Sequence, residues 1–142
     1  MNVQKIGDIL IARACLGEIS IKELQKYTKA ESPYVRSCAA VALGKIKEPG
    51  RYDLWLTMLE DSEELVVGDA ITSSAELNDS RCVVKLQELY MQKGYQIKTR
   101  VINALAQSQF PEAASILSDL QKEETNQALS GIIKEILQEM QK

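Results

Sequence analysis

Small and apolar residues recur along this chain with a period of 31 positions. Within each repeat they follow the spacing i, i+4, i+5, i+8 and i+9, which places them on one face of an α-helix. The four rows are Val35, Ala39, Ala40, Leu43 and Gly44; Val66, Ala70, Ile71, Ser74 and Ala75; Ile97, Val101, Ile102, Leu105 and Ala106; and Ala128, Ile132, Ile133, Ile136 and Leu137. Such a period is typical of repeat architectures, in which each unit packs against its neighbours.

The segments between these helices keep the same period and predict a second helix in each repeat. One column reads Leu24, Trp55, Leu86 and Leu117, and another reads Tyr27, Met58, Leu89 and Leu120. Each repeat is therefore expected to be a helix pair, an A helix followed by a B helix that carries the 31-residue rows. Because Trp55 shares its column with three leucines, we expect it in the core and not at a ligand.

Turn and capping residues divide the chain into nine predicted helices. Breaks are expected at Pro49-Gly50, Asn78-Asp79, Gly94 and Phe110-Pro111, and N-caps at Ser32, Ser62 and Thr125. The helices are predicted at roughly 3–15, 18–29, 33–47, 52–60, 63–77, 80–93, 95–108, 111–122 and 125–140. The first is a lone B-type helix, an N-terminal half-repeat expected to serve as a cap. No linker divides the chain, so residues 1–142 are expected to form a single domain.

The segment SPYVRSCAAVALGKI at 32–46 resembles the short HEAT-like repeat, with its Val-Arg pair, Ala-Ala and Ala-Leu-Gly. The resemblance covers nearly the whole chain and is strongest at 32–46. It implies an all-α, right-handed α-solenoid of about four 31-residue helix pairs plus the half-repeat, an armadillo-like superhelix whose B helices line the concave side. In this family the basic residue commonly forms a ladder with acidic residues of adjacent repeats. Here that column reads Arg36, Val67, Lys98 and Leu129, so two rungs are basic.

Composition excludes several kinds of site. The chain contains no histidine, which removes Ser-His-Asp and Cys-His catalysis and the commonest transition-metal ligand. Cys15, Cys38 and Cys82 have no CxxC spacing and are expected to be small buried or half-buried helix residues. No apolar run approaches the ~20 residues of a membrane span. We therefore expect a cytoplasmic protein without cofactor, metal or catalytic residue.

The B-helix positions opposite the core are candidates for contact with a partner protein. Four of them, Ser37, Gly68, Thr99 and Ser130, form a column of small residues that predicts a smooth groove for a partner helix or loop. Tyr34 is the best candidate for an exposed aromatic anchor. The residues expected to bind the partner are Tyr34, Ser37, Val41, Lys45, Asp69, Thr72, Glu76, Arg100 and Asn103.

Charge is unevenly distributed. Residues 51–80 hold 1 basic and 8 acidic groups, a net charge of −7, whereas residues 1–50 carry +3 and residues 81–142 carry +1. Asp61, Glu63 and Glu64 flank a predicted helix N-terminus, where the helix dipole favours them. Asp69 and Glu76 have no such explanation, so they are expected to form an acidic patch that meets a basic partner surface.

These features favour a non-catalytic protein-interaction module, such as an adaptor, scaffold or inhibitor. An alternative is an immunity protein that neutralises a basic enzyme such as a nuclease toxin, which rests on charge and size. A HEAT-like DNA glycosylase and a relative of the chromophore lyases are less favoured. The candidate groove has a net charge of only +1 from Lys45, Arg100 and Lys134 against Asp69 and Glu76, too little for phosphate binding. No nucleic-acid or membrane partner is therefore expected.

Overall fold

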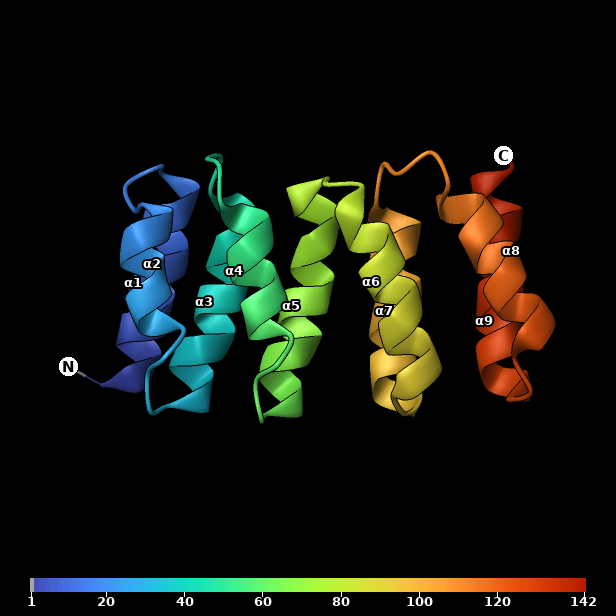
Figure 1. Ribbon diagram of the computed structural model, residues 1–142, viewed down its shortest axis with the longest axis horizontal. Coiled ribbons are helices and arrows are strands. Elements are labelled where there is room, and N and C mark those ends of the chain that lie inside the picture. The colour runs from blue at the N-terminus through green and yellow to red at the C-terminus, as the bar shows by residue number, and fades with distance from the viewer. Residues whose placement is uncertain (1) are drawn as a thin grey trace. The chain divides into compact units, whose positions relative to one another are not determined.

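The computed structural model describes residues 2–142 and is all-helical over that range. Its nine helices are α1 (Val3–Cys15), α2 (Ile21–Tyr27), α3 (Pro33–Lys45), α4 (Arg51–Met58), α5 (Glu64–Leu77), α6 (Arg81–Gln92), α7 (Tyr95–Gln107), α8 (Ala113–Glu123) and α9 (Gln127–Met140) (Figure 1). All nine predicted helices are present. The largest difference lies at α2, which begins three residues later than expected.

Side-chain caps explain where several helices begin. The oxygens of Ser20 and Ser32 accept the backbone N–H groups of Glu23 and Val35, at 3.1 and 3.3 Å. Pro33 follows Ser32 at the first helical position, where a missing N–H costs nothing. The last helix is capped by Asn126 and not by Thr125 as predicted, because the Asn126 amide oxygen accepts the N–H of Leu129.

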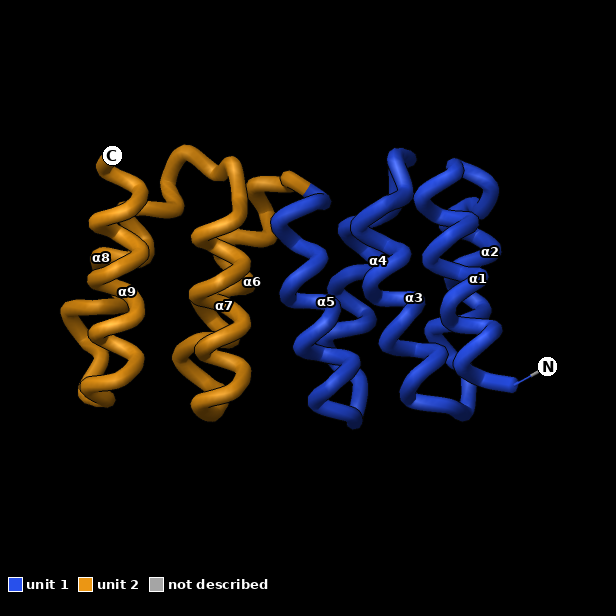
Figure 2. Tube along the Cα trace, turned by 180° about the vertical axis from the view of Figure 1, so that it is seen from behind, with its two compact units in different colours: residues 1–77 blue, residues 78–142 orange. Residues whose placement is uncertain are grey.

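The chain divides into two compact units, residues 1–77 and 78–142 (Figure 2). In the first unit the B helix α3 packs between the B helices α1 and α5, while the A helices α2 and α4 pack against α3 and α5. In the second unit the A helices α6 and α8 pack against the B helices α7 and α9. Each unit therefore combines A and B helices as the repeat predicts.

The two predicted A-helix columns are buried in both units, apart from Tyr27 of the second column, which is half-buried. Leu24, Trp55, Leu86 and Leu117 each have 0% of their surface exposed. The B-helix rows on α3, α5 and α7 are buried apart from half-buried Ala75 and Ala106. Ser74, the only polar member, is buried because its hydroxyl donates to the carbonyl of Ile71 in its own helix, at 2.6 Å.

The last row is less buried than predicted. On α9, Ile133 is buried, whereas Ile132, Ile136 and Leu137 are half-buried and Ala128 is exposed. Among the described residues α9 packs against α7 and α8, and these contacts leave most of its row partly uncovered. The prediction for the cysteines is right for Cys38 and Cys82, which are buried, and wrong for Cys15, which is exposed at the end of α1. None of the helices described here has the length and apolar character that crossing a membrane requires.

Trp55 lets the repeat register be tested. Its indole Nε1–H donates to the carbonyl of Ala70 at 2.6 Å, and its ring lies 5.9 Å from that of Tyr52. Trp55→Ala should lower the free energy of unfolding by about 3–5 kcal/mol, the usual cost of removing a large buried aromatic. Trp55→Phe should cost less, because it keeps most of the apolar volume and loses mainly the hydrogen bond. Urea unfolding followed by circular dichroism measures both, and a loss below about 1 kcal/mol for Trp55→Ala would contradict the register.

Candidate functional site

Three side-chain to side-chain contacts cross between neighbouring B helices of the first unit, and the Ser73 hydroxyl of α5 also donates to the backbone carbonyl of Ala40 on α3 at 2.5 Å. The Tyr34 hydroxyl of α3 donates to Asp8 of α1 at 3.1 Å. The Ser37 hydroxyl of α3 donates to the carboxylate of Asp69 on α5. At the other end of α3, the Lys45 ammonium lies 2.8 Å from the carboxylate of Glu76 on α5 (side-chain exposure 33% and 44%). These contacts tie α1, α3 and α5 together along one side.

The column of small residues is a packing seam and not a groove in this unit. Ser37 is only 4% exposed and Gly68 is buried, so neither offers surface to a partner. The same close approach occurs at Gly7 on α1, where an added Cβ would lie 2.6 Å from Cys38 Sγ and 2.8 Å from a Tyr34 ring carbon. The prediction of an open groove there is wrong, because small residues let two helix backbones approach each other. Thr99 and Ser130, in the other unit, are half-buried.

Most of the other predicted partner-binding residues do lie together. On α3, Tyr34 is 38% exposed and Val41 and Lys45 are half-buried. The α5 members are Asp69, Thr72 and Glu76, of which Asp69 is half-buried and the other two are exposed. We call these six residues the B-helix face: Tyr34, Val41, Lys45, Asp69, Thr72 and Glu76.

Arg100 and Asn103 belong to α7 of the second unit, where Arg100 is half-buried and Asn103 is exposed. The B-helix face as defined therefore draws all its residues from α3 and α5 of the first unit, and these two positions remain separate candidates.

Tyr34, Cys38 and Lys45 all have raised pKa values, so each stays protonated near neutral pH. Hydrogen bonding with Cys38 and Asp8 raises the pKa of Tyr34 to about 12. Burial raises the pKa of the Cys38 thiol, so it stays protonated near neutral pH. The hydrogen bond to Glu76 raises the pKa of Lys45 and keeps it cationic. The face therefore presents fixed charges and hydrogen-bonding groups, with no activated nucleophile among these residues.

Arg36 connects the loops that precede α3 and α5. Its guanidinium binds both oxygens of Asp61, at 2.8 and 3.3 Å, and also donates to the carbonyls of Ala30 and Glu31. The side chains of Arg36 and Asp61 are only 14% and 11% exposed. Asp61 in turn accepts the N–H of Glu63 just before α5. The Arg36–Asp61 ion pair therefore connects the loop before α3 with the loop before α5.

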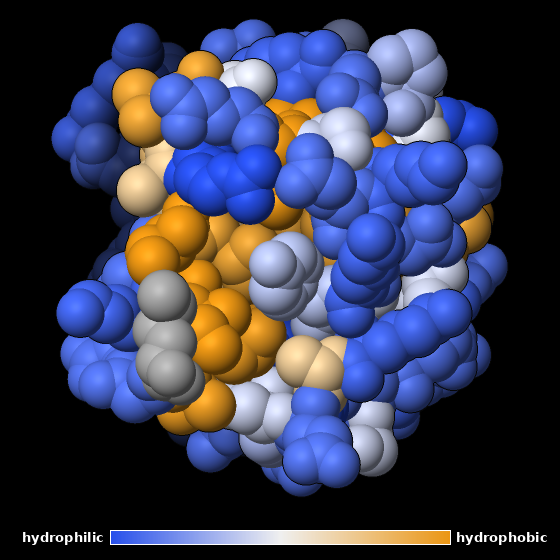
Figure 3. All heavy atoms as spheres, turned by 90° about the vertical axis from the view of Figure 1, so that its left-hand side faces the viewer, coloured by the Kyte–Doolittle hydropathy of each residue, from blue (hydrophilic) through white to orange (hydrophobic). Residues whose placement is uncertain are grey.

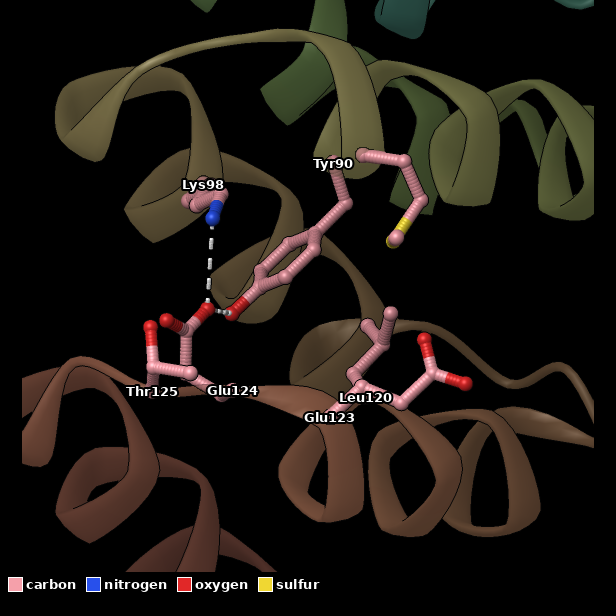
Figure 4. A pocket seen from close by; sticks show the side chains of 7 residues that line it. Tyr90, Lys98, Leu120, Glu123, Glu124 and Thr125 are labelled. Carbon is pink, nitrogen blue, oxygen red and sulfur yellow. Dashed lines mark hydrogen bonds and ion pairs between the residues drawn. The ribbon is translucent and has the colours of Figure 1, made fainter.

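Lys98, at the same repeat position as Arg36, lies in the other unit and lines a small cavity of about 90 Å³ (Figure 4). The Lys98 ammonium is 3.4 Å from the Glu124 carboxylate, and it lies 5.0 Å from the centre of the Tyr90 ring. The Tyr90 hydroxyl donates to the same Glu124 oxygen. The cavity is lined by Tyr90, Met91, Lys98, Leu120, Glu123, Glu124 and Thr125.

The side chains at this cavity bind one another, and the cavity is too small for a typical small-molecule ligand. Its volume is well below the roughly 300–1,000 Å³ of small-molecule sites. Sequence reasoning missed Tyr90 and Glu124. Lys98 could have indicated them, because it occupies the same repeat position as Arg36. A basic residue at this position predicts an acidic partner near the start of the next B helix.

No protein-family model matches the chain, and none of the curated proteins is significantly similar to it.

The close approach at Gly7 predicts a specific loss of stability. Gly7→Ala places a methyl group against Cys38 and Tyr34, and should destabilise the first unit by about 1–3 kcal/mol despite the better helix propensity of alanine. The matched control is Gly131→Ala on α9, where an added Cβ meets nothing within 4 Å. That variant should be neutral or slightly more stable. Equal effects of the two substitutions in thermal unfolding would contradict the close packing of α1 against α3 at Gly7.

The contacts of Glu124 predict a pH dependence. Although burial opposes it, hydrogen bonds from Tyr90 and the Asn126 N–H, with the charge of Lys98, lower the pKa of Glu124. A lowered pKa stabilises the fold above the ordinary value of about 4.3, and this contribution disappears as the pH falls through the lowered pKa. Glu124→Gln should therefore be less stable than the parent at pH 7, and the difference should shrink towards pH 3. The control is Glu123→Gln at the neighbouring last residue of α8; a pH-independent difference for Glu124→Gln would contradict the assignment.

Proposed function

We propose that this protein is a non-catalytic, cytoplasmic protein-interaction module, an adaptor, scaffold or inhibitor built as a HEAT-like α-solenoid. The B-helix face of α3 and α5 is its partner-binding surface. The observation that carries this proposal is the pair of contacts Ser37–Asp69 and Lys45–Glu76, which joins the two helices into one surface.

A surface fixed in this way suits a protein partner. The ion pair and hydrogen bonds already restrict long side chains such as Lys45 and Glu76, so less rotamer entropy is lost when a partner docks. Tyr34, a residue that is 38% exposed, adds an aromatic side chain held through its hydroxyl by Asp8. Rigid aromatic side chains of this kind are enriched among the residues that dominate interface energies.

The charge of this region favours a basic partner. Residues 51–80, which include α5, carry a net charge of −7. Asp61 and Glu76 form intramolecular ion pairs with Arg36 and Lys45, which reduces their contribution to the negative potential. Glu60, Glu63 and Glu64 near the start of α5 are exposed and extend the acidic region to solvent. An acidic surface accelerates encounter with a basic partner, and salt weakens this effect.

Neutral, nearly isosteric substitutions test the role of the face. In Asp69→Asn with Glu76→Gln, the side-chain oxygens can still accept from Ser37 and Lys45, so the helical circular dichroism should be unchanged. Association with a captured basic partner should slow several-fold, and the dependence of the rate on salt should become weaker. Stopped-flow or surface plasmon resonance at several salt concentrations measures both.

The matched control removes two carboxylates elsewhere, with Asp119→Asn and Glu123→Gln on α8. It produces the same change in net charge but leaves the B-helix face intact, so its association rate should stay close to that of the parent. Equal slowing by the two double variants would mean that only net charge matters. An unchanged rate and salt dependence in Asp69→Asn with Glu76→Gln would place the interface elsewhere.

The position of the interface can also be read directly. A photo-reactive amino acid at Thr72, on the face, should form a covalent link to the partner, whereas one at exposed Gln25 on the A helix α2 should not. Linking at Gln25 alone would contradict the proposed surface.

A further inference from the structure

An open cleft lies in the second unit, between the B helices α7 and α9. It has a volume of about 390 Å³ and is lined by Ala106 of α7 and by Glu135, Ile136, Glu139 and Met140 of α9. Glu135, Glu139 and Met140 are exposed, whereas Ala106 and Ile136 are half-buried. Small-molecule sites normally enclose most of their ligand. Because most of its lining residues are exposed, this cleft suits side chains that project from a larger partner.

The repeat register explains why α7 and α9 leave this space. In the first unit, an added Cβ on Gly44 of α3 would lie 3.4 Å from the Cβ of Ser73 on α5, and the Ser73 hydroxyl donates to the carbonyl of Ala40. Two periods of 31 residues later, Ala106 replaces Gly44 and Glu135 replaces Ser73. An ionised glutamate has no proton to donate to a carbonyl. The contact that closes α3 onto α5 therefore cannot form between α7 and α9, which pack less closely.

The cleft has negative charge beside its apolar surface. Glu135 and Glu139 are four residues apart, so they lie one turn apart on the same side of α9, where two like charges weaken a helix. Glu139 is 2.8 Å from Lys142, but both side chains are more than 70% exposed, so this ion pair is weak. The Glu135 carboxylate has no ion pair or hydrogen bond with any residue that the structure describes. A cationic group from a partner is therefore favoured here.

The apolar surface at the α1 and α2 end of the first unit has basic residues beside it instead. Figure 3 shows hydrophobic side chains gathered at this end, with hydrophilic ones around them. Ile9 of α1 is 41% exposed, and Lys5 and Arg13 stand four residues before and after it, one turn away on the same side. A basic partner is therefore favoured at the cleft more than at this end.

We propose that the cleft binds a basic amphipathic helix of another protein. Large apolar side chains of that helix enter the cleft against Ala106, Ile136 and Met140, while its Lys or Arg residues, one turn apart, pair with Glu135 and Glu139. Amphipathic helices commonly bind in an apolar groove in this way. Met140 suits such a site, because its flexible and polarizable side chain adapts to apolar groups of different shape. This site belongs to the second unit and does not depend on the B-helix face.

Fluorescence anisotropy with a labelled synthetic peptide tests the proposal. The probe is an amphipathic helix of leucine and lysine, with leucines at positions i, i+3, i+4 and i+7. The comparison peptide has glutamate in place of every lysine. The leucine–lysine peptide should bind the parent protein with the higher affinity, and added salt should weaken its binding. No binding of this peptide, or equal binding of the two peptides, would overturn the proposal.

Two variants separate the charge of the cleft from its shape. Glu135→Gln with Glu139→Gln should raise the dissociation constant about tenfold and leave the helical circular dichroism unchanged, because both residues are exposed. Ala106→Leu keeps both charges but fills the cleft, and should weaken binding as well.

Matched controls show whether the peptide responds to the cleft or to net charge alone. Glu88→Gln with Asp119→Asn removes two exposed carboxylates from the A helices of the same unit and should leave the affinity unchanged. The variant Asp69→Asn with Glu76→Gln, which alters the B-helix face, should also leave it unchanged. Equal weakening by all three double variants would overturn the proposal, and so would weakening by Asp69→Asn with Glu76→Gln alone.

Methyl NMR locates the peptide on the parent protein, without any substitution. The methyl signals of Ile136 and Met140 should shift when the leucine–lysine peptide is added, whereas that of Val84, exposed on the A helix α6, should not. Shifts at Val84 with none at Ile136 and Met140 would place the peptide outside the cleft and overturn the proposal.

Discussion

The close approach of the B helices α1, α3 and α5 is the constraint on which the first unit depends. Helix backbones come this near only where side chains are small, and the chain places Gly7, Ser37 and Gly44 at those points. At Gly7 an added methyl group would overlap Cys38, and at Gly44 it would press on Glu76, 3.3 Å away. Because eight residues of α3 are buried between its neighbours, this helix is the centre of the unit.

The polar contacts follow from this packing. Once α3 and α5 lie side by side, Ser37 reaches Asp69 and Lys45 reaches Glu76, and these contacts set the side chains of the proposed binding face. Arg36 and Lys98 use the same repeat position for support, each reaching a carboxylate in the loop before a later B helix. The residues that fix the fold and those that shape the face are therefore neighbours on the same helices.

The sequence predicted the nine helices and the buried columns because the 31-residue period records which side of each helix is apolar. Trp55 was placed correctly by the leucines in its column. The period does not show which neighbouring helix, if any, packs against each side of a helix. Ser37 was therefore expected in a groove although it is packed between helices, and Cys15 was expected to be covered although it is exposed. The Tyr90–Glu124 contact was missed because it depends on a loop, where no periodicity guides prediction.

Amide hydrogen exchange measured residue by residue tests the central role of α3 most directly. If α3 is the centre of the first unit, the amides of Ala39 to Gly44 should exchange only through unfolding of the whole unit, more slowly than any in α2 or α4. Gly7→Ala should then accelerate exchange throughout α3 and not only in α1. Exchange from α3 that is as fast as from α2, or that is unaffected by Gly7→Ala, would contradict the account.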